Sequence, residues 1–424
     1  MNPSPATDSP ASWRVLAGCC IVGIFGVTSL YGSTFGLMML PMQKELGWSR
    51  GDITFVLTLM TLVGPAILPL VGWVIDHVRL RPLILWGVAL QSASLASFGF
   101  MHGSVWVYYG LSLIMVVTAS GASVLTLSKL LQIWFDKALG RALGILFAVG
   151  AVGAVIHPQV VSLVIAHASW REAFMAMGLM SLVFGGLAAW LLLREPAAAV
   201  AAPQRPPSLL QPAAGVPPVS MRGFLKDRLW WNLALWNMLF GLAAAGVLVH
   251  FAALMQDRGL SLAQAAMAMS LVGAGGFAGN LAAGWLIDHT SATRLARLFV
   301  LAPLGATTML FFGTGLGVAI AAAVLLGMFN AGDHSLSAFL ARRYFSSASY
   351  GRAFATQQIA TAFGAGTAPW LMGVAHDRTG SYDMAIMAAM SAFVLAAIAA
   401  WMLPEHRGGG PAGPLPNAAR APAS

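Results

Sequence analysis

The hexapeptide GWVIDH at residues 72–77 recurs as GWLIDH at residues 284–289, with an offset of 212. The tripeptide GRA at residues 140–142 recurs at residues 351–353, with an offset of 211. Several matches at nearly one offset indicate an internal duplication, whereas one short match would be weak evidence. The offset of 211 also relates two pairs of residues that shape helices: Gly153 with Gly364, and Pro158 with Pro369.

The composition indicates a membrane protein. Hydrophobic residues make up 58% of the 424 residues and charged residues only 9%, against about 25% in soluble domains. The net charge is +9, but the basic residues lie in short segments between long apolar runs, which is a pattern of membrane topology. These features argue against a soluble enzyme, a disordered protein and a nucleic-acid-binding domain.

Apolar runs divide the chain into membrane spans, since a helix needs about 20 apolar residues to cross about 30 Å of hydrocarbon. The sequence predicts an all-α polytopic protein of twelve spans in two six-helix repeats. The predicted spans are 14–40, 52–75, 83–102, 105–133, 141–167, 173–193, 229–255, 262–287, 296–314, 317–341, 352–375 and 383–403.

The twelve spans group into four segments. We predict an N-terminal six-helix bundle over 1–195 and a C-terminal six-helix bundle over 227–403. Between them lies a Pro/Ala-rich linker over 196–226, and a disordered tail follows over 404–424. With the N-terminus in the cytoplasm, 17 of the 23 Lys and Arg residues fall on the inner side and 5 on the outer side. This bias predicts that the linker and both termini are cytoplasmic.

The repeated motif resembles the signature of the major facilitator superfamily, which has a glycine, three residues, an aspartate and then basic residues. In the first copy these are Gly72, Asp76, His77, Arg79 and Arg81. The resemblance implies a fold of two six-helix halves that expose a shared central site to each side of the membrane in turn. Parallel repeats about an axis normal to the membrane are suited to such alternating access.

A finer resemblance is to the bacterial monocarboxylate-transporter-like and oxalate/formate-antiporter-like branch of that superfamily. It covers nearly all of residues 12–403. The segments that carry it are YGSTFGLMMLPMQKELGWSRGDIT (31–54), WFDKALGRALGI (134–145), SWREAF (169–174), RRYFSSASYGRAFA (342–355) and GVAHDRTGSYD (373–383).

The repeated motifs predict a cytoplasmic gate. Asp76 and Asp288 each end an even-numbered span, and we expect Arg141 and Arg352, which open later spans, to lie near them. Such pairs would close one conformation and break in the other, and the glycines of the motif would permit close helix approach. The predicted gate residues are Gly72, Asp76, Arg79, Arg141, Gly284, Asp288 and Arg352.

Two ionisable residues lie well inside predicted spans. Asp333 is nine residues from Arg342, about 14 Å from the inner end, and Lys129 is seven residues from Asp136, about 10 Å in. Charges at such depth are costly and usually face a polar cavity, so both are candidate groups for substrate or proton binding. The other polar candidates for this site are His334, His157, His250, Tyr31, Asn280 and Gln357.

One departure from the resemblance concerns the eighth span. Relatives carry an arginine four residues before the glycine of the second motif, where it pairs with a substrate carboxylate. In this chain the position is Asn280. Lys129 or a protonated histidine would then supply the positive charge for an anionic solute.

The sequence therefore predicts a secondary transporter of a small organic solute, most simply a carboxylate, coupled to protons. It would work as a monomer in the bacterial cytoplasmic membrane, with no cofactor, metal or nucleic-acid partner. An efflux transporter of drugs or amphipathic solutes with the same fold remains an alternative. A membrane enzyme is disfavoured because the chain lacks HExxH, nucleophile-elbow and phosphate-loop motifs.

Overall fold

The computed structural model describes residues 8–195, 221–345 and 349–404, and within these ranges the chain is helical without strands. The N-terminal half (N-half) holds α1 (Pro10–Ile24), α2 (Val27–Leu46), α3 (Arg50–His77), α4 (Leu80–Ser97), η1 (Phe98–Phe100), α5 (Val105–Ser120), α6 (Val124–Trp134), α7 (Leu139–His167), α8 (Trp170–Met180), η2 (Ser181–Gly186) and α9 (Leu187–Leu192).

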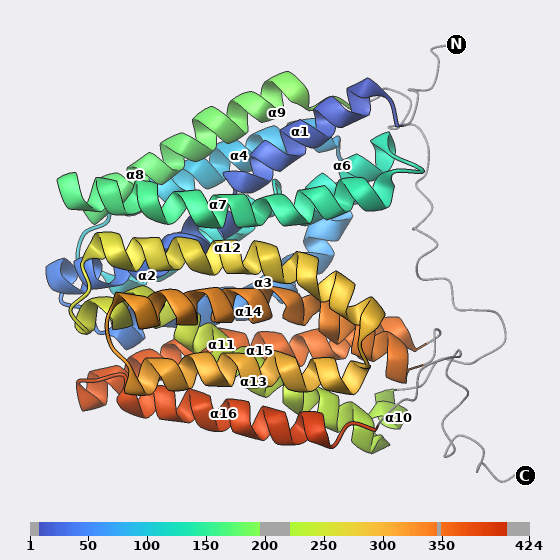
Figure 1. The fold of residues 1–424 in the computed structure, drawn as a ribbon. Helices are drawn as coiled ribbons and strands as arrows, with labels where there is room; N and C mark the ends of the chain where they lie inside the picture. The colour runs from blue at the N-terminus through green and yellow to red at the C-terminus, as the bar shows by residue number, and fades with distance from the viewer. Residues whose placement is uncertain (1–7, 196–220, 346–348, 405–424) are drawn as a thin grey trace, which may run out of the picture.

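The C-terminal half (C-half) follows the same plan with fewer interruptions. Its helices are α10 (Met221–Lys226), α11 (Arg228–Asp257), α12 (Leu262–His289), α13 (Ala292–Phe312), α14 (Leu316–Tyr344), α15 (Tyr350–Thr379) and α16 (Asp383–Trp401). The long helices of both halves run side by side, and α1 begins at the same end of the molecule at which α16 finishes (Figure 1). We call this end the terminal end and the opposite end the distal end.

The predicted all-α membrane class is confirmed, and each predicted span coincides with a helix or with consecutive helices. Among the described residues, ten helices are long and apolar enough to cross a membrane, or eleven if the bent α3 counts as one span. The one predicted span that remains, 352–375, is α15, which is 30 residues long but carries Gln357, Gln358 and several threonines. In the predicted linker, residues 196–220 lie outside the described residues and 221–226 form α10. Residues 405–424 of the predicted tail are also outside them.

The duplication is visible in the turns that precede α3 and α12. Gly47 and Gly259, which the repeat relates, have φ of 69° and 89°, a left-handed conformation that a side chain disfavours. Two residues later, Ser49 and Ser261 each cap the next helix through a capping box. Equivalent local sequence therefore builds the same turn at the distal end of each half.

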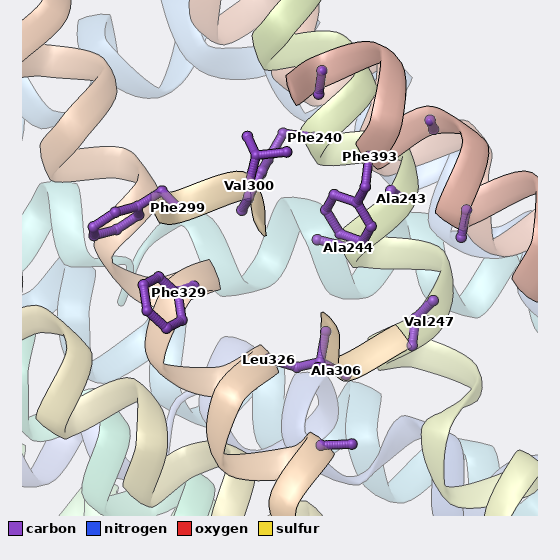
Figure 2. Packing of buried hydrophobic residues seen from close by; sticks show 14 of the residues in the cluster. Phe240, Ala243, Ala244, Val247, Phe299, Val300, Ala306, Leu326, Phe329 and Phe393 are labelled. Atoms are coloured by element: carbon purple, nitrogen blue, oxygen red, sulfur yellow. The ribbon is translucent and has the colours of Figure 1, made fainter. Parts of the chain in front are cut away.

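Aromatic and small side chains fill the core of the C-half. Phe240 of α11 meets Phe393 of α16 with ring centroids 5.8 Å apart, and Phe299 of α13 meets Phe329 of α14 at 5.1 Å. Alanines and valines occupy the space between these pairs (Figure 2). A Cβ added to Gly332 would lie 2.5 Å from the Phe299 ring, so this core also fixes the backbone beside Asp333.

Substituting Gly279 is expected to destabilise the C-half. A Cβ at Gly279 of α12 would overlap the carbonyl oxygen of Met328 in α14, so Gly279→Val forces the two backbones apart. Overpacking of this kind costs about 1–3 kcal/mol. Thermal unfolding of purified protein should show a lower transition temperature than for Gly305→Val, because nothing lies within 4 Å of a Cβ at Gly305. Equal transition temperatures would contradict the close approach of α12 and α14.

Candidate functional site

Contacts between the two halves lie in the distal parts of the helices. Three pairs of helices carry the contacts named here, and each contact falls within about 20 Å of the distal end. The contacts are Gly36 of α2 with Val249 of α11, Phe55 of α3 with Trp370 of α15, Thr58 of α3 with Gly366 of α15, and Gln159 of α7 with Ser270 of α12. Ala154 of α7 also packs on Gly273 of α12.

Toward the terminal end the same helix faces are uncovered. Four side chains are exposed at positions that lie seven residues, or about two helical turns, from contact residues on the terminal side. They are Leu62 (62% exposed), Phe147 (62%), Phe277 (42%) and Phe363 (60%). In the view of Figure 1, α7 and α12 lie close at the distal end and diverge toward the terminal end. The halves therefore close on each other distally and part toward the terminal end.

A cluster of charged residues joins the halves at the distal end. The Arg50 guanidinium at the start of α3 donates to both carboxylate oxygens of Asp257, at the end of α11, over 2.5 and 2.9 Å. The backbone N–H groups of Arg50 and Gly51 donate to the Asp377 carboxylate of α15 over 3.0 and 2.7 Å. His376 Nε2 lies 3.4 Å from Asp257. We call Arg50, Asp257, His376 and Asp377 the distal clamp.

Tyr382, in the loop after α15, extends the distal clamp into the protein. The Arg50 guanidinium lies 5.1 Å from the centre of its ring. Burial raises the pKa of Tyr382 above its usual range, with Arg50 opposing the shift, so the hydroxyl keeps its hydrogen. That hydroxyl lies 2.8 Å from His250 Nδ1, while His250 Nε2 lies 2.8 Å from the Pro369 carbonyl oxygen. Because the carbonyl only accepts, Nε2 donates and Nδ1 accepts, and both nitrogens of His250 are satisfied.

A second polar group lies inside the C-half and joins three helices. Ser337 of α14 donates to Asn237 Oδ1 of α11 over 2.7 Å, and Thr361 of α15 donates to the same oxygen over 3.2 Å. Asn237 Nδ2 in turn lies 3.4 Å from Gln357 Oε1. We call Asn237, Ser337, Gln357 and Thr361 the C-half polar cluster. Gln357 Nε2 is buried and has no hydrogen-bond partner among the described residues.

Asp333 lies one helical turn distal to Ser337 on α14, so the two share a face of the helix. Its side chain is 3% exposed, and its Oδ1 atom is buried without a hydrogen-bond partner among the described residues. A buried carboxylate is costly when it is charged and unpaired, and a bound proton removes that charge. Among the described residues of the C-half, Asp333 thus has a carboxyl oxygen, and Gln357 an amide nitrogen, that forms no hydrogen bond.

The terminal end carries the residues of the predicted gate, but Asp76 does not pair with Arg141 as predicted. Asp76 forms an ion pair with Lys129 of α6, which also donates to the Ile75 carbonyl oxygen over 3.2 Å. Arg141 is exposed and forms no ion pair in the described part of the chain. The long Lys129 side chain reaches Asp76 from within its own half, so its charge is used at the terminal end instead of in a central site.

The other gate residues also fall at the terminal end. Nothing lies within 4 Å of a Cβ placed on Gly72, so the predicted close helix approach there is wrong for this structure. Arg79 precedes α4 and is exposed, and Arg352 is exposed near the start of α15. Gly284 and Asp288 belong to the terminal part of α12. These positions are consistent with halves that are parted at this end.

The remaining predicted site residues divide between the core and the opening. The Tyr31 hydroxyl lies 3.1 Å from the Tyr108 hydroxyl inside the N-half core, which places Tyr31 away from the space between the halves. Asn280 is exposed on α12, two turns from Gly273 on the face that contacts α7. His334 follows Asp333 on α14. His157 of α7 is fully buried, and neither ring nitrogen has a partner among the described residues.

Several residues of these clusters were not anticipated. Arg50 and Asp377 stand in the sequence only as charges at span ends, and Asn237 as a polar residue in an apolar run. One signal was present for Asp257, because the repeat makes it the counterpart of Glu45. Glu45 pairs with Arg171 within the N-half, whereas Asp257 pairs across the halves.

Comparison with known proteins places the chain among transporters. The profile of the Major Facilitator Superfamily matches residues 19–318. The chain is 27% identical over 382 residues to a probable sulfoacetate transporter, SauU, of Cupriavidus necator, covering 81% of this chain and 83% of that protein. It is 24% identical over 312 residues to monocarboxylate transporter 12-B of Danio rerio, covering 66% of this chain and 63% of the relative's length.

A solved structure supports the fold. The crystal structure of the nucleoside transporter NupG superposes with a TM-score of 0.74 at 14% sequence identity, covering 93% of this chain and all of that chain (100%). At this identity the likeness concerns the fold alone. The predicted membership of the major facilitator superfamily is confirmed, and monocarboxylate transporters are among the sequence relatives.

Proposed function

Since this chain belongs to the Major Facilitator Superfamily, and so is an integral membrane transporter of small solutes and not an enzyme, we propose that it carries a small organic carboxylate by proton-coupled alternating access. The proposed setting is the bacterial cytoplasmic membrane, with the terminal end in the cytoplasm and the protein working as a monomer. The excess of Lys and Arg at the terminal end supports this orientation.

The observation that carries the mechanism is the one-sided contact between the halves. The distal clamp and the neighbouring contacts hold the distal ends together, while the equivalent faces are exposed toward the terminal end. A transporter that alternates must break one set of contacts and form another. Asp333 adds a buried carboxyl with an unused oxygen, suited to bind and release a proton as its surroundings change.

The substrate class rests on the relatives. Sulfoacetate and monocarboxylates are the solutes in their names, and all of these are small organic anions with a carboxylate. The identities are only 27% and 24%, so the shared chemistry is the carboxylate rather than one compound.

Transport by purified protein in liposomes tests the proposal. We expect a proton gradient, with the lower pH outside the liposomes, to drive uptake of at least one radiolabelled solute. The panel consists of acetate, lactate, sulfoacetate and benzoate. We also expect unlabelled solute trapped inside to accelerate uptake by exchange. Failure of every panel member under both conditions would contradict a carboxylate transporter.

Aromatic and aliphatic side chains at the opening favour one second candidate, an exporter of amphipathic solutes. Leu62, Phe147, Phe277 and Phe363 are all exposed there. Efflux of a lipophilic cationic dye from the same liposomes, with no transport of any carboxylate, would select this candidate.

A further inference from the structure

The first membrane span is broken near its middle. Helix α1 ends at Ile24 and α2 begins at Val27, so Phe25 and Gly26 connect them within one apolar stretch. Gly26 is extended, with φ −76° and ψ 159°, and has no side chain to cap α2. The N–H groups of Val27 and Thr28 have no acceptor among the described residues. A helix N-terminus with free N–H groups attracts anions.

The start of α2 faces the space between the halves. Gly36 on this helix packs against the Val249 carbonyl of α11, 2.7 Å from an added Cβ. Gly32 and Thr28 lie one and two turns from Gly36 toward the terminal end, on the same face, and both are exposed. A solute that enters from the terminal end therefore meets Thr28 and the free N–H groups beside it.

His157 of α7 lies against the break. The Ser29 hydroxyl, the Ile24 carbonyl oxygen and His157 Cε1 all lie within 3.0 Å of the position that a Cβ on Gly153 would occupy. Glycine at 153 thus allows α7 to approach the break closely. The Phe25 ring lies 5.6 Å from the imidazole, which has no exposed surface. The Ser29 backbone lies beside the ring, but neither nitrogen makes a hydrogen bond of ordinary geometry among the described residues. A polar ring in this place is costly unless a ligand or a movement of the connection satisfies it.

Three other basic side chains that are largely or fully buried already have partners. Lys129 is paired with Asp76, Arg50 with Asp257, and both nitrogens of His250 are hydrogen-bonded. His157 is therefore the buried basic group left available to an anion.

We propose that the break in the first span, with the N–H groups of Val27 and Thr28 and the imidazole of His157, forms the subsite for the carboxylate of the solute. This inference rests on the proposed transport of a carboxylate and names the residues that would recognise it. One imidazole N–H and two backbone N–H groups donate to the carboxylate oxygens, and each such bond to a charged acceptor is charge-assisted. The two-residue connection at Phe25 and Gly26 moves to admit the carboxylate to the ring.

The test compares a carboxylate with its neutral amide. Initial uptake of labelled lactate and lactamide is measured in liposomes for the wild type, His157→Gln and His157→Asn, with His167→Gln as the control at the exposed end of the same helix. We expect the wild type and the control to prefer lactate over lactamide by tenfold or more in kcat/KM. Loss of a charge-assisted contact should lower this preference about tenfold or more in both His157 variants, with lactamide uptake unchanged.

The possible outcomes distinguish a wrong subsite from a wrong proposed function. If the wild type transports neither probe and no carboxylate of the wider panel, the proposed function fails. If the wild type prefers lactate and the His157 variants keep that preference, the subsite is wrong and the function stands. Equal losses of lactate and lactamide uptake in both His157 variants would also overturn the subsite, because a structural role lowers both.

Discussion

Replacing Asp333 with asparagine is expected to abolish uphill accumulation while exchange of labelled for unlabelled solute continues. The buried carboxyl has an oxygen without a partner among the described residues, and asparagine fills the same volume but cannot bind and release a proton. A pH difference of one unit is equivalent to about 1.4 kcal/mol and supports about tenfold accumulation for one proton per solute. We therefore expect accumulation to fall from about tenfold in the wild type to none in Asp333→Asn.

The matched control is Asp383→Asn, which removes a carboxylate of the same half at the distal start of α16. Asp383 is largely exposed and lies 3.7 Å from Arg258. Its loss should leave the accumulation ratio unchanged. pH-driven accumulation by Asp333→Asn at the wild-type ratio would remove Asp333 from the coupling mechanism. Loss of exchange together with accumulation would show that Asp333 serves the solute and not the proton.

Replacing Asp257 with asparagine is expected to shift the protein toward a state that is open at the distal end. The change leaves Arg50, whose side chain is 5% exposed, without its charged partner. Hydrogen bonds to charged groups contribute about 1.5–3 kcal/mol, so the balance between the two states should move about 10- to 100-fold. Reaction of a cysteine introduced at Thr58, which is buried against Gly366, reports distal opening.

The repeat supplies a close control for that experiment. Glu45 occupies the position of Asp257 in the N-half and forms an ion pair with Arg171 of the same half. Glu45→Gln thus removes an equivalent distal carboxylate without touching a contact between the halves. Labelling of Thr58→Cys should rise in Asp257→Asn and stay low in Glu45→Gln. Equal labelling in the two variants would mean that the distal clamp does not hold the halves together.

Much of the fold was predictable because its causes are local. The hydrophobic length of each span, the left-handed glycines at 47 and 259, and the serine caps that follow them are all readable within a few residues. The count of spans was harder at α15, where glutamines and threonines replace apolar residues. That helix is packed between α3 and α11, so its environment is protein and a low hydropathy is tolerated.

The candidate site was only partly predictable because its contacts are distant along the chain. Depth alone identified Asp333, since a charge so far from any loop is unusual. The pair of Arg50 with Asp257 joins residues 207 apart, and no local pattern encodes it. Depth also suggested a central role for Lys129, but a flexible side chain reaches well beyond its own backbone and finds Asp76.

The distance between the halves at both ends, measured by pulsed electron resonance on spin labels, tests the account most directly. One pair of labels, at the exposed residues His167 and Ala263, reports the distance between the distal ends of α7 and α12. A second pair, at the exposed residues Lys137 and His289, reports the distance between their terminal ends. The account predicts two populations in which one distance lengthens as the other shortens, with transported solute changing their ratio. Distances at both ends that stay fixed, or that lengthen together, would contradict two halves that open to one side at a time.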